Sequence, residues 1–79
     1  MKIIEVTWFD AQSSLKHISV EDAIKNITPR ITKSVGYLVK ECDDYILLAF
    51  MKFDDDSFKH WQVIPKGMIK SRKVIKKNG

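Results

Sequence analysis

The residues able to do chemistry are few in this sequence, and no familiar spacing joins them. Cys42 is the only cysteine and lies among acidic residues, whose charges disfavour the thiolate that nucleophilic catalysis needs. His17 and His60 have no carboxylate or hydroxyl partner at a spacing typical of a catalytic pair. We therefore expect a protein that is not an enzyme, with no catalytic residues and no cofactor.

Three consecutive acids, Asp54 to Asp56, are the strongest candidate for holding a hard cation. Adjacent carboxylates on a turn point in different directions, and the ligand spacing of a calcium loop is missing. The pattern favours a solvated turn, so we expect no metal site.

A set of aromatic and cationic residues is the most informative group. Stacking on aromatic side chains beside cations is a common way for β-surfaces to hold bases or nucleotides. Tyr45 and Trp61 would stack with the base, and the cations of the last strand and its approach would meet phosphates. The predicted ligand-binding residues are Tyr45, Trp61, Lys66, Lys70, Arg72 and Lys73. A purely structural role for Trp61 and Tyr37, in the core or at a subunit interface, stays open.

Trp8 and Asp10 form a second candidate site near the N-terminus. The two residues either line a pocket at the loop 10–14, or the Trp8 indole anchors the end of the sheet. The sequence alone does not separate these readings.

Charge is unevenly distributed along the chain. The formal net charge is +4, and residues 66–79 hold six cations and no acid. Six of the ten acids fall in two clusters, one at positions 41, 43 and 44 and one at 54–56. If both clusters are turns at one end of a sheet, the other end is cationic and suits phosphate-bearing or acidic partners. A lysine-rich segment that only aids solubility is the alternative.

Several short strands and one helix must position these residues. Alternating apolar residues predict strands at about 2–9, 31–41, 45–53, 58–64 and 68–75. The helix is expected at about 20–27, with the Ser19 hydroxyl as its N-cap and Pro29 ending it. Its apolar positions recur at i, i+3, i+4 and i+7; they are Val20, Ala23, Ile24 and Ile27. A helix of two turns is not stable alone, so we expect it to lie against the sheet.

The strand pattern predicts a mainly β fold with one short helix, in a single domain spanning 1–79. Gly36 interrupts the second strand and indicates a bulge or bend. The segment from Tyr45 to Met51 is apolar on both faces, which is typical of a central strand. The four strands after residue 30 form the expected unit, and the N-terminal strand looks like an attachment to it.

A bent strand at Gly36, tight hairpins and the link Ile64-Pro65-x-Gly67-x-Ile69 resemble small barrels of the Src-homology-3 and Sm-like type. The resemblance implies a closed, strongly bent five-stranded barrel, here with an additional N-terminal strand. Sm-like proteins bind RNA in rings, but their RNA-contacting residues have no match at identifiable positions of this sequence.

Four short motifs resemble small uncharacterised proteins of bacteriophages and prophages. They are Trp8-x-Asp10, the run 34–39 (SVGYLV), the run 44–46 (DYI) and the IPKGxI link at 64–69. The resemblance covers most of the chain, and it specifies a fold better than a function.

Length and composition bear on assembly and location. A 79-residue chain builds a core that yields only ~3–5 kcal/mol, and neither disulfides nor metals are expected to reinforce it. We therefore expect a homo-oligomer. A lone cysteine indicates a reducing, cytoplasmic setting, which is the host cytoplasm if the chain is phage-encoded. No apolar run approaches the ~18 residues of a membrane span.

These observations rank two functions. The first is a non-catalytic phage-type accessory protein that binds a phosphate-bearing ligand, either single-stranded nucleic acid or a small nucleotide. In one variant of this function, the protein sequesters a host nucleotide signal. The alternative is a protein–protein inhibitor or adaptor that acts on a host enzyme.

Overall fold

A computed structural model describes residues 1–11 and 17–78 of the chain. Five strands, one α-helix and one 3₁₀ turn follow one another, in the order β1 (Ile3–Asp10), α1 (Val20–Asn26), β2 (Arg30–Glu41), β3 (Tyr45–Lys52), β4 (Phe58–Pro65), η1 (Lys66–Met68) and β5 (Ile69–Lys76). The protein is thus mainly β with one short helix, as the sequence predicts. The strands lie within two residues of the predicted bounds.

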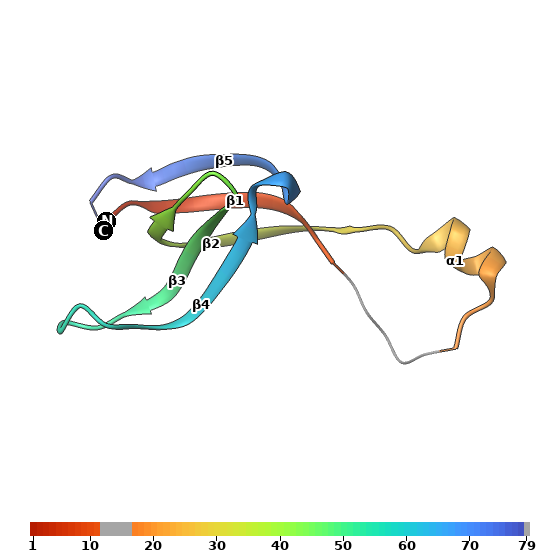
Figure 1. Cartoon of the computed structure of the whole chain (residues 1–79), viewed down its shortest axis with the longest axis horizontal. Helices are drawn as coiled ribbons and strands as arrows, with labels where there is room; N and C mark the ends of the chain where they lie inside the picture. Colours follow the sequence, from red (N-terminus) through yellow and green to blue (C-terminus); the bar gives the residue numbers. More distant parts are fainter. Residues whose placement is uncertain (12–16, 79) are drawn as a thin grey trace.

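All five strands belong to one antiparallel sheet with the order β4-β3-β2-β1-β5. The sheet is strongly curved, with β3 and β4 turned steeply away from β1 and β5 (Figure 1). In the described part of the chain no pairing joins β4 to β5, so both remain edge strands. The closed barrel predicted from the sequence is therefore corrected to an open, curved sheet.

The N-terminal strand is an interior strand rather than an attachment. β1 pairs with β2 on one side and with β5 on the other. Three of its residues, Ile4, Val6 and Trp8, are buried in the core. The sequence analysis was wrong here because alternation shows that a strand has a buried face, and it does not show which strands lie beside it.

The core lies on one face of the sheet, which we call the inner face. Its side chains come from alternate positions of β1, β3 and β4, with Leu38, Met68 and Ile69 packed against them. The fully or nearly buried members of this cluster are Ile4, Val6, Trp8, Ile46, Leu48 and Ile64. Because successive side chains of a strand point to opposite faces, Val35, Tyr37, Trp61 and Val63 lie on the other side, the outer face.

Gly36 marks a close approach between β2 and β3. A Cβ atom at this position would lie 2.8 Å from the Ala49 carbonyl oxygen, which real contacts do not allow. The pairing of the same two strands shifts register between Leu38 and Lys40. The irregularity predicted at Gly36 is not formed at that residue, which pairs regularly with Ile4, and the register shift comes after Leu38. Glycine is required at position 36 because its neighbour is backbone.

The helix begins as predicted but does not pack as predicted. Ser19 Oγ accepts a hydrogen bond of 3.1 Å from the Asp22 N–H, which caps the first turn. None of the seven helical residues, all of which are described, is buried. Figure 1 shows α1 at the far end of an arm that projects from the sheet. The expectation that the helix lies against its own sheet is therefore wrong.

Candidate functional site

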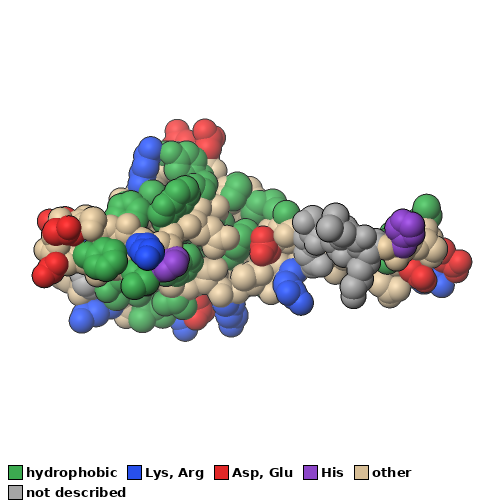
Figure 2. All heavy atoms as spheres, turned by 90° about the horizontal axis from the view of Figure 1, so that it is seen from below, with side chains coloured by type: hydrophobic (Ala, Val, Ile, Leu, Met, Phe, Trp, Pro, Cys, Tyr) green, Lys and Arg blue, Asp and Glu red, His purple; other side chains and the backbone are tan. Residues whose placement is uncertain are grey.

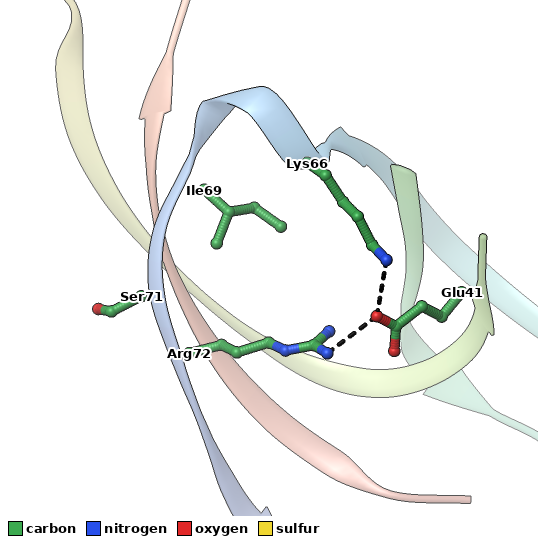
Figure 3. Close-up of a pocket in the computed structure, with 5 residues that line it drawn as sticks. All are labelled: Glu41, Lys66, Ile69, Ser71 and Arg72. Atoms are coloured by element: carbon green, nitrogen blue, oxygen red, sulfur yellow. Dashed lines mark hydrogen bonds and ion pairs between the residues drawn. The ribbon is translucent and has the colours of Figure 1, made fainter. Parts of the chain in front are cut away.

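Glu41, Lys66 and Arg72 form the main charged cluster at the open side of the sheet. Glu41 ends β2, Lys66 begins η1, and Arg72 lies in β5 opposite Val6 of β1. Val6 belongs to the core, so its cross-strand neighbour Arg72 also extends from the inner face. The end of β2 and the distant η1–β5 segment thus bring their charges to one place (Figure 3).

One carboxylate oxygen holds both cations. Glu41 Oε2 lies 2.9 Å from Arg72 Nη2 and 3.0 Å from Lys66 Nζ. The Lys66 N–H also donates a 2.8 Å hydrogen bond to the Asp44 carbonyl, which fixes the start of η1 against the β2–β3 turn. Hydrogen bonds from Arg72 and then Lys66 lower the pKa of Glu41 to about 2. Glu41 is therefore ionised at neutral pH, with two cations arranged around it.

A cavity of about 320 Å³ opens beside this cluster and is lined by Glu41, Lys66, Ile69, Ser71 and Arg72. The Ile69 side chain and the two cationic groups face this cavity, whereas the Ser71 hydroxyl points away (Figure 3). Its volume falls at the lower end of the ~300–1,000 Å³ typical of small-molecule sites.

A smaller cavity of about 180 Å³ adjoins the first and shares Glu41 and Arg72 with it. Its polar lining adds Lys2 and Lys73, and its apolar lining comes from Ile4, Leu38 and Val74. Together the two cavities are lined by four cations and one acid. The chemistry of this lining suits an anionic group attached to a small apolar body.

The structure brings together only part of the predicted ligand set. Lys66 and Arg72 converge, and Lys73 lines the adjoining cavity. Lys70 lines neither of these two cavities. Lys2 and Glu41 were missed, since Lys2 was taken as part of an attached strand and Glu41 as part of an acidic turn.

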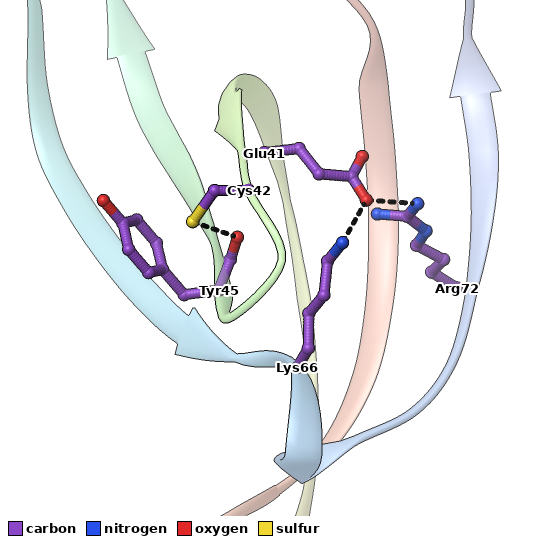
Figure 4. Close-up of polar contacts among 5 residues, drawn as sticks. All are labelled: Glu41, Cys42, Tyr45, Lys66 and Arg72. Carbon is purple, nitrogen blue, oxygen red and sulfur yellow. Dashed lines mark hydrogen bonds and ion pairs between the residues drawn. The ribbon is translucent and has the colours of Figure 1, made fainter.

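The predicted aromatic residues lie away from the cations. Trp61 is on the outer face, 62% exposed, opposite Ala49. The Tyr45 ring points away from the Glu41 cluster (Figure 4). Its hydroxyl accepts a 2.8 Å hydrogen bond from Lys40 Nζ. Neither ring lines the cavities at Lys66 and Arg72.

Trp8 is buried and lines none of the cavities described here. Its side chain is 5% exposed and its Nε1 donates a 3.1 Å hydrogen bond to Ser34 Oγ. The indole therefore anchors the sheet, which is one of the two readings of this residue. Asp10 ends β1, and most of the loop 10–14 lies outside the described residues. A cavity near this end of β1 is lined by Ala11, Met68 and the segment 27–29.

The two acidic turns lie at opposite ends of β3, because one connects β2 to β3 and the other connects β3 to β4. The expected separation of an acidic end from a cationic end is therefore not formed. Asp55 is stabilised locally, since hydrogen bonds from the Ser57 side chain and backbone lower its pKa.

Other chemistry finds little support in the described residues. Among residues 1–11 and 17–78, no three or more His, Cys, Asp and Glu side chains are grouped as metal ligands. Cys42 is half-buried, and its Sγ lies 3.6 Å from the Tyr45 carbonyl oxygen inside the β2–β3 turn (Figure 4). Within the same ranges, no helix has the length and apolar character that a membrane span requires.

Comparisons with protein families, curated proteins and solved structures found no match to this chain.

Proposed function

We propose that this protein is a non-catalytic binding module for a phosphate-bearing ligand, and that the ligand occupies the paired cavities around Glu41. The observation that supports this most is the position of Lys66 and Arg72, which are held within 3.0 Å of one carboxylate oxygen at a cavity mouth. Cations fixed in advance lose little conformational freedom when an anion binds. A phosphate group carries enough charge and enough acceptor oxygens to engage both.

The geometry favours a small nucleotide over a nucleic-acid strand. Lys2, Lys66, Arg72 and Lys73 gather around two small adjoining cavities, whereas a strand's backbone is followed by a long cationic groove. The apolar wall formed by Ile69, Leu38 and Val74 offers contact to the rest of a small ligand. Sequestration of a host nucleotide fits the resemblance to small bacteriophage proteins.

The fold itself supports a related proposal. A 3₁₀ turn precedes the last strand, and the first strand lies between the second and the last. We propose that the sheet is related to the Src-homology-3 and Sm-like barrels, with an opening between β4 and β5.

Calorimetric titration with pyrophosphate, ATP and a single-stranded oligonucleotide tests the ligand class. Arg72→Gln and Lys66→Gln should each weaken binding by roughly tenfold or more, because a hydrogen bond to a charged group contributes ~1.5–3 kcal/mol. Glu41→Gln should tighten binding, since the carboxylate competes with the ligand for both cations. Lys70→Gln is the matched control, with the same loss of charge outside the cavities, and should change the affinity little.

Salt dependence gives a second readout. Raising the salt concentration should weaken binding in proportion to the number of phosphate contacts neutralised by cations. An affinity that is equal at low and high salt, or equal losses in Lys70→Gln and Arg72→Gln, would contradict the proposal.

Exposed apolar surface supports the alternative function, a protein–protein inhibitor or adaptor. Sixteen large hydrophobic residues of the described chain are exposed, against six in the buried core cluster. Retention of a host enzyme on the immobilised protein, with no binding of pyrophosphate or either nucleotide probe, would favour this function over ligand binding.

A further inference from the structure

The apolar stripe of α1 is uncovered in the isolated chain. Val20 and Ile24 are 77% and 78% exposed, and Ile27 is also exposed. A seven-residue helix is well below the ~12–15 residues at which helices become even marginally stable alone in water. The sequence nevertheless specifies this helix through a cap and a regular stripe. A stripe of this kind is stabilised when another surface covers it.

The chain's own sheet does not provide that surface. The molecule measures 50 × 23 × 21 Å along its principal axes, and α1 lies at one end of the long axis (Figure 1). Figure 1 shows the helix apart from the strands. The covering surface must come from another molecule.

The outer face of the sheet carries exposed apolar side chains that could cover the apolar stripe of α1 in another copy. Tyr37 pairs with Ala49, which pairs in turn with Trp61, so these three side chains form a row across β2, β3 and β4. Val35 and Val63 lie next to this row, and both are exposed. Figure 2 shows apolar side chains gathered on the side of the body formed by β3 and β4. We call Val35, Tyr37, Trp61 and Val63 the outer patch.

Charge around the two surfaces is complementary. The first turn of α1 contains Glu21, which pairs with Lys25 at 3.3 Å, and Asp22. The outer face holds Lys33, opposite Thr7 of β1, and Lys59, opposite Met51 of β3, with Glu5 of β1 on the same face. A helix with an acidic start laid across the outer patch therefore meets lysines at its rim.

We propose that the protein forms a two-fold dimer in which α1 of each copy lies on the outer patch of the other copy. Exchange of an identical element is a low-cost route to a symmetric dimer, and each contact is then made twice. Both uncovered surfaces of both copies are buried together, which brings the interface toward the ~800 Å² per partner of a standard complex. The Glu41 cavities lie on the inner side and take no part.

Sedimentation velocity of the full chain across a concentration series tests the dimer. The natural sequence should sediment as a dimer that dissociates on dilution. Ile24→Asp and Trp61→Lys should each weaken dimerisation by more than roughly tenfold, because each places a charge in the apolar contact. Ile75→Asp, at an exposed apolar position of β5 outside both surfaces, is the matched control and should still dimerise.

Mixing the two variants separates exchange from other arrangements. In a mixed dimer the intact helix of the Trp61→Lys chain meets the intact patch of the Ile24→Asp chain. One of the two helix–patch contacts is therefore made of unchanged residues. The mixture should associate more tightly than either variant alone. A monomeric natural sequence at all concentrations, or a dimer insensitive to Ile24→Asp, would overturn the proposal; so would mixing that restores nothing.

Ligand binding measured on the same samples distinguishes a failure of the dimer proposal from a failure of the proposed function. Thermal unfolding and pyrophosphate binding of Ile24→Asp should match those of the dissociated natural protein. If pyrophosphate binding is absent throughout and the dimer persists, only the proposed function fails.

Discussion

At the scale of single residues, Glu41 has the largest effect on how the charges are arranged. It was predicted to be one of several acids in a turn, but its side chain extends inward and pairs with two cations. The register shift between Leu38 and Lys40 places Glu41 opposite Ile46, a core residue, and so on the inner face. Two of the cations expected to attract a ligand are therefore partly neutralised by the chain itself.

This pairing predicts a specific acid sensitivity. The pKa of Glu41 is about 2 in the folded protein, against an ordinary value of 4.5. The folded state is therefore stabilised when the Glu41 carboxylate is ionised. Its contribution to stability is complete above about pH 4.5 and is lost as the pH falls toward 2. Urea unfolding at a series of pH values should show a steeper loss of stability in this interval for the natural sequence than for Glu41→Gln.

Asp54→Asn, in the other acidic turn, is the control for a general change of charge. It should leave the steeper loss in place. If Glu41→Gln and the natural sequence lose stability in parallel between pH 4.5 and 2, the ion pairs contribute nothing to folding, as is the case for many exposed pairs.

At the scale of elements, the sequence pattern predicts the position in the sheet for some strands and not for others. β1 has a regular alternation and a buried inner face, yet its place between β2 and β5 could not be derived from it. For β3 the prediction of a central position is confirmed, because it pairs on both sides. The close approach of β2 to β3 depends on one residue, Gly36, whose neighbour across the sheet is the backbone of Ala49.

Substitution of Gly36 should therefore destabilise the fold. In Gly36→Ala the new Cβ meets the Ala49 carbonyl oxygen, and relieving this overlap by a backbone shift typically costs ~1–3 kcal/mol. Gly67→Ala is the matched control, because nothing lies within 4 Å of a Cβ at that position. Chemical unfolding of both variants measures the difference. Equal stabilities would show that β2 and β3 can separate without cost.

At the scale of the whole molecule, an open curved sheet carries a projecting arm. The edges β4 and β5 are not joined by hydrogen bonds in the described residues. The cluster around Glu41 instead links the end of β2 to η1 and β5 by side chains. Stability should therefore be concentrated in the strands that pair on both sides and should be lowest in the arm.

Amide hydrogen exchange in dilute protein tests this distribution. The amides of β1 and β3 should exchange most slowly, through global unfolding, whereas those of α1 should exchange at close to the rate of an unfolded chain. Raising the concentration should protect α1 if the helix is exchanged between copies. Protection of α1 equal to that of β3 in dilute protein would show instead that the helix packs on its own sheet.

The sequence by itself determined the elements of this protein. Alternation, glycine, proline and the Ser19 cap act over a few residues, so the helix and all five strands could be located from local chemistry. The tertiary structure decided the rest, including the openness of the sheet and the isolation of the helix. The contacts responsible join residues far apart in the chain, such as Arg72 with Glu41 and Trp8 with Ser34. Local patterns specify which face of a strand is buried, but the choice of its neighbours is made only when distant segments pack together.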